Sequence, residues 1–155
     1  MIVVVSGIRD LHPDDVFVVK AEVAMFGQAR SVSEWRTGGA MGVDAAALSA
    51  LWELYPHHAA RTTWLPVSGS PPEAARALVQ RCSSEIIDLG LPRQPASFPK
   101  RNKLMLDGWT PTGPRGKADW LLAFTDRREH GGTAGTSDLA RAIGVQVQVV
   151  EVRAR

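Results

Sequence analysis

Ile2-Val-Val-Val-Ser6 is a short apolar run made almost wholly of β-branched residues. Such runs are typical of strands that are buried on both faces of a parallel sheet. Directly after it, apolar residues recur at spacings of three and four over residues 13–26, which predicts an amphipathic helix. These apolar residues are Val16, Val19, Val23 and Phe26. A buried strand followed by a helix is the opening unit of an α/β fold.

The same alternation continues to the end of the chain. Further strands are expected at 31–36, 61–65, 84–89, 118–125 and 145–152. Helices are expected at 43–55, 71–81, 99–107 and 136–143, and a loop at 108–117. Because this alternation gives parallel strands joined by right-handed crossovers, we predict one Rossmann-like α/β domain over 1–155. Its mostly parallel six-stranded sheet should carry helices on both faces.

The composition excludes several classes of protein. With 155 residues, 45% of them hydrophobic, the chain suits a globular domain, and its net charge of +2 is too small to argue for nucleic acid. A single cysteine, Cys82, excludes an internal disulfide and a multi-cysteine metal site, and fits a reducing compartment. Without a His pair or carboxylate cluster at ligand spacing, we predict no metal and no cofactor. No apolar run has the ~18 residues of a membrane span. No basic region precedes the first strand, so we expect no signal peptide and a cytoplasmic protein.

Candidate ligand-binding residues follow three of the predicted strands, where open α/β sheets bind their ligands. The first segment is Ser6-Gly7-Ile8-Arg9. Gly7 permits a tight turn or a close approach of the backbone to a ligand, and Arg9 could donate charge-assisted hydrogen bonds to a phosphate. The alternative is a plain turn with a solvated arginine.

The second segment is Thr37-Gly38-Gly39-Ala40-Met41-Gly42-Val43-Asp44, which opens a helix. Its glycines bare backbone N–H groups beside a helix N-terminus, and together these favour an anion. Asp44 could cap the helix or reach a ribose hydroxyl. A bulky residue at Gly39 should therefore damage ligand binding with little loss of fold.

The third segment is Gly131-Gly132-Thr133-Ala134-Gly135-Thr136, followed by Ser137 and Asp138. Its amides and hydroxyls could hold a phosphate, although it lacks the Gly-Lys-Ser/Thr ending of a P-loop. The alternative is a surface loop that caps a helix.

Several motifs together resemble one known superfamily. The 37–44 segment resembles the GGAxGxD turn of the SLOG superfamily, which groups DprA/Smf proteins with LOG phosphoribohydrolases, and the 6–9 segment resembles its GSR start. The Arg101-Asn102-Lys-Leu-Met105 motif, the apolar strand ending in Ala123-Phe124, and the Gly132-Thr133-Ala134 turn with its Ala-rich helix are similar to the YspA-like branch. The resemblance implies a Rossmann-like fold, a nucleotide or nucleotide-derived ligand, and a homo-oligomer such as a dimer.

The resemblance also assigns candidate residues to two sides of the ligand. Gly38, Gly39, Gly42 and Asp44 would form the first phosphate and ribose side. The other phosphate side would be formed by Arg101, Asn102, Gly131, Gly132, Thr133 and Thr136.

Two other functions remain open beside ligand binding. LOG enzymes use RKxxM and PGGxGTxxE motifs, whose Glu takes part in cleaving an N-glycosidic bond. Here Arg101 matches, but Asn102 replaces the Lys and Leu139 stands in place of the Glu. Asp138 and Arg101 are the candidate catalytic pair. Asp138 lies one residue before the position of the Glu, and one residue along a helix rotates a side chain by about 100°. We therefore place hydrolysis, through Asp138 or Asp44, below binding.

The third possibility is DprA-like binding of single-stranded DNA. It would need a basic groove with stacking aromatic residues. Candidates are Lys100, Arg101, Lys103, Trp109, Arg115 and Lys117. We favour the alternative in which Trp109 packs on the domain edge and these charges are solvated.

Overall fold

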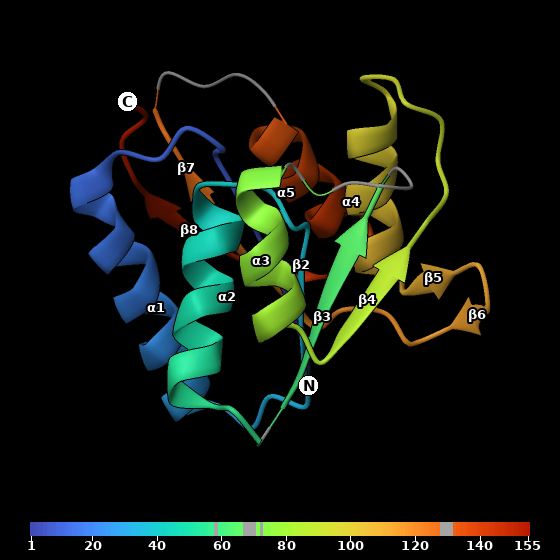
Figure 1. Cartoon of the computed structure of the whole chain (residues 1–155). Coiled ribbons are helices and arrows are strands. Elements are labelled where there is room, and N and C mark those ends of the chain that lie inside the picture. Colours follow the sequence, from blue (N-terminus) through green and yellow to red (C-terminus); the bar gives the residue numbers. More distant parts are fainter. Residues whose placement is uncertain (58, 67–70, 72, 128–131) are drawn as a thin grey trace.

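A six-stranded sheet, parallel throughout, forms the centre of the computed structural model (Figure 1). The structure describes residues 1–57, 59–66, 71, 73–127 and 132–155. The strands are β1 (Ile2–Gly7), β2 (Glu34–Thr37), β3 (Ala60–Leu65), β4 (Glu85–Asp88), β7 (Trp120–Thr125) and β8 (Gln146–Glu151). They lie in the order β4-β3-β2-β1-β7-β8, which confirms the predicted α/β fold.

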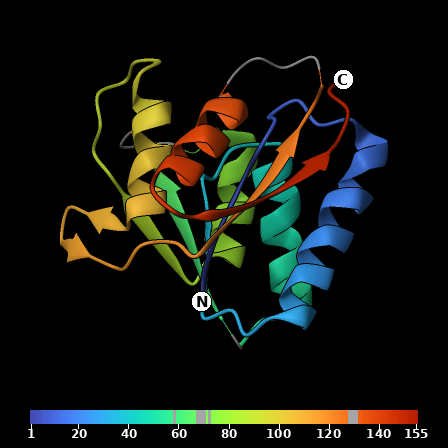
Figure 2. The ribbon, with the colours of Figure 1, turned by 180° about the vertical axis from the view of Figure 1, so that it is seen from behind.

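Helices cover both faces of this sheet, as predicted. Helices α1 (Val16–Ala29), α2 (Val43–Leu54) and α3 (Glu73–Cys82) lie on one face. Helices α4 (Ser97–Asp107) and α5 (Gly132–Ala142) lie on the other, as Figure 2 shows from behind. A short 3₁₀ helix, η1 (Pro13–Asp15), leads into α1.

Several element boundaries differ from the sequence-based expectation. Helix α5 begins at Gly132, four residues before the expected start at 136, so Thr133 and Thr136 are helical rather than part of a turn. The expected loop at 108–117 contains a small antiparallel hairpin, β5 (Trp109–Thr110) with β6 (Gly113–Pro114). The second strand is shifted to Glu34–Thr37 from the predicted 31–36. Residues 67–70 and 72, around the expected start of the helix at 71–81, lie outside the described residues, as does Gly131.

Alternate residues of β1 pack into separate cores, which explains its unbroken apolar run. Val3 and Val5 belong to the core beneath α1 and α2, which includes Val23, Leu51 and other residues. Val4 belongs to the core beneath α4 and α5. Because both faces of the central strand are covered, every residue that crosses the middle of the sheet gains by being apolar.

A buried ion pair in β2 ties the sheet to α4 and to the hairpin. Arg36 donates hydrogen bonds from Nε and Nη2 to the Glu34 carboxylate, both at 3.1 Å. Its Nη1 donates to the Met105 carbonyl at 2.7 Å, and Nη2 also donates to the Arg115 carbonyl. Thr62 donates to the same carboxylate at 2.9 Å. The charged groups are buried but fully paired, which is the condition under which such burial is tolerated.

Removing one member of this pair should be costly. Glu34→Ala leaves the fully buried Arg36 without its carboxylate, so we expect a loss of about 3–5 kcal/mol in the free energy of unfolding. Glu85→Ala is the matched control, because Glu85 pairs with Arg115 at 2.7 Å on the surface and such pairs contribute less than about 1 kcal/mol. Urea denaturation of both variants measures the difference. Equal losses would show that the Arg36–Glu34 pair does not stabilise the sheet.

Candidate functional site

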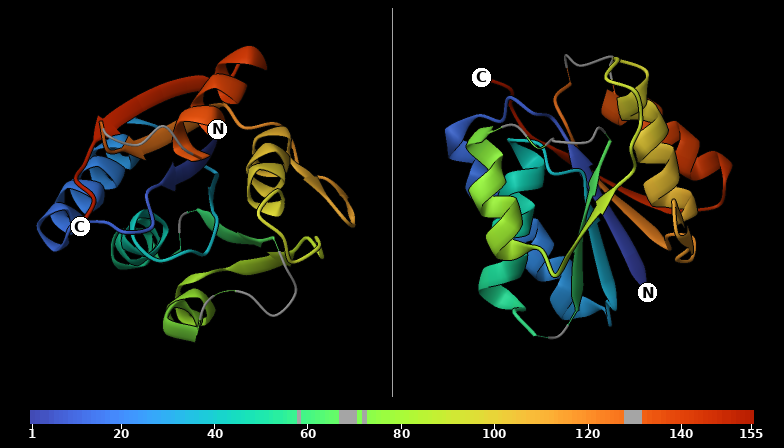
Figure 3. Two further views of the ribbon diagram at one scale, coloured as in Figure 1. Left: turned by 90° about the horizontal axis from the view of Figure 1, so that it is seen from above. Right: turned by 45° about the vertical axis from the view of Figure 1, so that its right-hand side comes forward.

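The strand order reverses beside β1, and a cavity lies at this point. Strand β1 leads through α1 to β2 on one side, whereas β4 leads through α4 to β7 on the other side. Figure 3, left, looks onto the carboxyl ends of these strands. The cavity there has a volume of about 620 Å³ and is lined by segments that follow β1, β2, β7 and β8 and by α4 and α5. Such a switch point is where open α/β sheets bind ligands.

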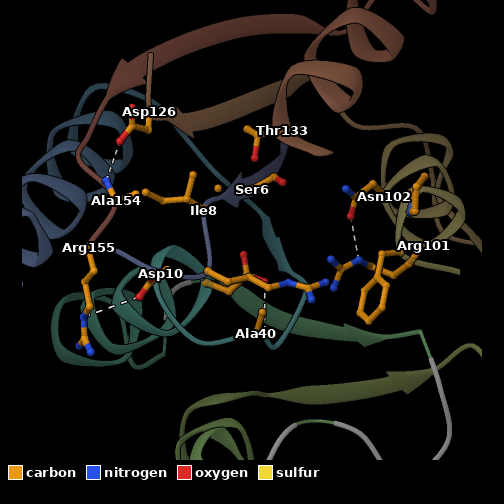
Figure 4. Close-up of a pocket in the computed structure, with 15 residues that line it drawn as sticks. Ser6, Ile8, Asp10, Ala40, Arg101, Asn102, Asp126, Thr133, Ala154 and Arg155 are labelled. Atoms are coloured by element: carbon orange, nitrogen blue, oxygen red, sulfur yellow. Dashed lines mark hydrogen bonds and ion pairs between the residues drawn. The ribbon is translucent and has the colours of Figure 1, made fainter. Parts of the chain in front are cut away.

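Seven of the predicted site residues line this cavity: Ser6, Gly7, Arg9, Asp44, Arg101, Asn102 and Thr133. They come from four separate parts of the chain, and the first and second glycine-bearing segments therefore meet α4 and α5 at one edge. In Figure 4, Ser6 and Thr133 face the cavity opposite Arg101 and Asn102. The lining also includes Phe98, Asp10, Asp126, Ala154 and Arg155, which the sequence analysis did not single out.

A chain of hydrogen bonds fixes the α4 side of the cavity. Arg101 is buried, and its Nη1 donates to the Gly38 carbonyl at 2.6 Å. Its Nε donates to Asn102 Oδ1 at 2.8 Å, a bond drawn in Figure 4. Asn102 in turn donates from Nδ2 to Thr136 Oγ1 at 2.8 Å. Asn102 thus joins α4 to α5, and a lysine at this position could not accept the bond from Arg101.

Gly38 lets the Arg101 guanidinium lie against the backbone of the turn after β2. A Cβ added at Gly38 would lie 1.9 Å from Arg101 Nη1 and 2.7 Å from Asp44 Oδ2. The Arg101 guanidinium and the Asp44 carboxylate therefore both lie close to the Cα of Gly38, which carries no side chain. A glycine is required here by this close approach.

Asp44 is buried in the first turn of α2 and lines the cavity. Its Oδ2 accepts a hydrogen bond from the Ala40 N–H at 3.1 Å. Burial raises the pKa of the Asp44 carboxyl above its usual value, and the attraction of Arg101 counters only part of that rise. Burial also lowers the pKa of Arg101, and the nearby positive charge of Arg9 lowers it further.

Arg9 is the cavity arginine whose hydrogen-bonding groups are uncommitted. Its guanidinium lies over the Phe98 ring, 4.1 Å from the centroid. Within the described part of the chain it forms no hydrogen bond and no ion pair. Stacking orients a guanidinium without occupying its in-plane N–H donors. An anion in the cavity would therefore meet a pre-oriented donor group.

Some predicted site residues do not face the cavity. The Asp138 side chain is 82% exposed on α5 and pairs with Arg141 at 3.4 Å. Gly39 and Gly42 adopt positive φ angles of 72° and 75° and are absent from the lining. A Cβ at Gly39 would lie 2.8 Å from Thr63 Cγ2, so the expectation that a bulky residue there would spare the fold is wrong. Gly132 begins α5, and Gly131 is not described.

The residues considered for DNA binding do not form a free basic groove. Lys103 pairs with Asp107, and Arg115 pairs with Glu85. Lys117 donates to the Ile143 carbonyl at 2.8 Å. Trp109 is exposed on the hairpin β5–β6. This hairpin follows the C-terminal end of α4, whereas the cavity is lined by the N-terminal half of that helix.

The described residues contain neither a membrane-spanning helix nor a cluster of metal-binding side chains. None of their helices is long and apolar enough to cross a membrane. They also contain no group of three or more His, Cys, Asp or Glu that could hold a metal ion.

The chain shares its fold with solved structures of low sequence identity. The structural-genomics target TM1055 has a TM-score of 0.63 at 18% identity, over 94% of this chain and 71% of that one. The Moco carrier protein from Chlamydomonas reinhardtii has a TM-score of 0.60 at 17% identity, over 96% of this chain and 75% of that one. A second structure of that carrier gives 0.57. No family model and no curated protein matches the chain. The likeness shows a Rossmann-like α/β fold.

A methyl group at Gly38 should disturb this site directly. Gly38→Ala forces the Arg101 guanidinium away from the turn, and such overpacking typically costs about 1–3 kcal/mol. Gly135→Ala is the control, because nothing lies within 4 Å of a Cβ added there in α5, and Ala in a helix is favoured over Gly by about 0.5–1 kcal/mol. Chemical denaturation should show opposite signs for the two variants. A neutral Gly38→Ala would mean that Arg101 does not depend on this contact.

The raised pKa of Asp44 predicts a pH dependence of stability. Because the folded protein holds this proton more tightly than the unfolded chain, wild-type stability falls as pH rises from the unfolded pKa of about 3.9 through the raised folded pKa. Asp44→Asn lacks this loss. We expect the variant to gain on the wild type between pH 4 and pH 7 in urea denaturation. If the wild type instead gains stability relative to Asp44→Asn as pH rises, attraction to Arg101 outweighs burial in setting the pKa of Asp44.

Proposed function

We propose that this protein binds a nucleotide or a nucleotide-derived phosphorylated ligand in the cavity at the carboxyl edge of the sheet. One observation carries the proposal. Two guanidiniums, those of Arg9 and Arg101, and one buried carboxyl, that of Asp44, line the same cavity. Arg9 lowers the pKa of Arg101, so the two positive charges are close enough to repel each other. A bound anion would relieve that repulsion.

The remaining lining suits the other parts of such a ligand. Thr133, in the first turn of the 11-residue helix α5, faces the cavity, and a helix N-terminus favours a phosphate. Asp44 could accept a hydrogen bond from a ribose hydroxyl, as the resemblance to the SLOG superfamily implies. The volume of about 620 Å³ lies in the usual range for small-molecule sites. We assign the chain to that superfamily, in its YspA-like branch, as part of this proposal.

A binding role is placed ahead of a catalytic one. One structural neighbour is named as a carrier of the molybdenum cofactor, and a carrier holds its ligand intact. In this chain the position of the catalytic Glu of LOG enzymes is Leu139, which packs against the core beneath α5.

Ligand binding can be tested by thermal shift with nucleoside monophosphates, nucleoside diphosphates and ADP-ribose. A ligand at a hundred times its Kd should stabilise the wild type by about 2.7 kcal/mol. Arg9→Gln should weaken binding at least tenfold, because it removes a charge-assisted contact of about 1.5–3 kcal/mol. Arg141→Gln, which removes an equal charge from the outer face of α5, should bind like the wild type. Stabilisation by none of these compounds would refute the proposal.

Hydrolysis of the N-glycosidic bond is the second candidate, favoured by the buried carboxyl of Asp44 in the cavity. A carboxyl with a raised pKa keeps its proton to a higher pH than usual and can therefore act as a proton donor. Chromatography of the same incubations would reveal free base. In that case Asp44→Asn should abolish release, and Asp138→Asn, on the exposed side of α5, should not. Intact nucleotide in every incubation would leave binding alone.

A further inference from the structure

A second cavity lies at the opposite edge of the sheet from the first. It lies where α1 and α2 end and β2 begins, and Figure 1 shows how these three elements are arranged. Its volume is about 340 Å³. The walls include Gly27, Arg30, Val32, Trp35 and Tyr55. None of these residues belongs to the first cavity, so the function proposed above does not depend on them.

Trp35 brings an unpaired hydrogen-bond donor to this cavity. Its side chain is 1% exposed, yet the indole N–H has no acceptor among the described residues. Every fully buried side-chain nitrogen or oxygen in that part of the chain does have a hydrogen-bond partner. The indole nitrogen therefore belongs to the small part of the Trp35 surface that is accessible. Because Trp35 lines this cavity, we infer that the nitrogen faces it. A donor held this deep requires an acceptor from outside the chain.

Arg30 brings a second uncommitted donor to the same place. Its guanidinium lies 4.1 Å from the centroid of the Phe26 ring and 4.8 Å from that of Trp120. It forms no ion pair and no hydrogen bond within the described ranges. The two rings hold the Arg30 charge in place by cation–π contacts, while its N–H groups stay available for hydrogen bonds. It is the only charged side chain on the described cavity wall.

We propose that this second cavity binds a small carboxylate attached to an apolar, ring-sized body. The carboxylate accepts hydrogen bonds from the Arg30 guanidinium and the Trp35 indole N–H, and it neutralises the charge of Arg30. The apolar body packs on Val32 and on the Tyr55 ring. Gly27 lets the Tyr55 and Trp35 rings approach α1, because a Cβ there would lie 3.1 Å from the Tyr55 ring and 3.2 Å from Trp35 Cζ2. A methyl group at this position would push both rings toward the cavity.

The test follows the indole N–H signals of the five tryptophans in a ¹H–¹⁵N spectrum during titration with benzoate. Trp35→Phe identifies the Trp35 signal by its loss. We expect benzoate to shift that signal in a saturable way. Benzyl alcohol, which has the same ring without the charge, should bind at least tenfold more weakly. This comparison uses the unaltered protein, so it does not depend on how any variant folds.

Two variants localise the effect. Arg30→Gln should weaken benzoate binding at least tenfold, and Gly27→Ala should weaken it by narrowing the cavity. Arg9→Gln is the control, because it lies in the first cavity and should leave benzoate binding unchanged. Absence of a saturable shift would mean that the cavity binds no such ligand. Equal binding of benzoate and benzyl alcohol would mean that it does not recognise a carboxylate. Either result would overturn the proposal. Nucleotide binding in the first cavity is measured separately, so either proposal can fail alone.

Discussion

The buried guanidinium of Arg101 is the contact on which the candidate site depends. It holds the turn after β2 through the Gly38 carbonyl and holds its own neighbour Asn102, which reaches α5. A charge buried this far from water is stable only while its donors are satisfied. Three segments that are distant in sequence are therefore kept together by two neighbouring side chains, Arg101 and Asn102. One side of the cavity is polar because these two side chains line it.

The sheet itself was predictable because its central strands carry the strongest signal. Residues 2–5 and 120–124 are apolar without interruption, as is typical of a strand covered on both faces. The start of α5 was missed for a physical reason. Gly-Thr-Ala-Gly has weak helix propensity, and tertiary packing of Thr133, Thr136 and Ser137 overrides it. The 108–117 hairpin is too short to leave a strand pattern.

The site was predicted in part. Residues that directly follow β1 and β2 were found because strand ends mark ligand sites, and Asp126 could have been found in the same way, since it follows β7. Phe98 gave no such signal, because an aromatic residue in a helix usually packs in the core. Gly39 was assigned to the ligand, although its positive φ and its contacts with β3 are sufficient reason for a glycine. A sequence shows that a glycine is present, but the surrounding packing decides why.

The amide of Asn102 has a consequence for the walls of the first cavity. Its oxygen accepts from Arg101 on the same helix, and its nitrogen donates to Thr136 on α5. The two helices therefore cannot slide past each other without breaking the Asn102–Thr136 bond. At the opposite rim, the segment after β1 meets residues 154–155 through the Asp10–Arg155 ion pair at 3.8 Å. Salt screens an exposed pair of this kind, so this contact weakens as ionic strength rises, whereas the hydrogen bond between α4 and α5 is buried.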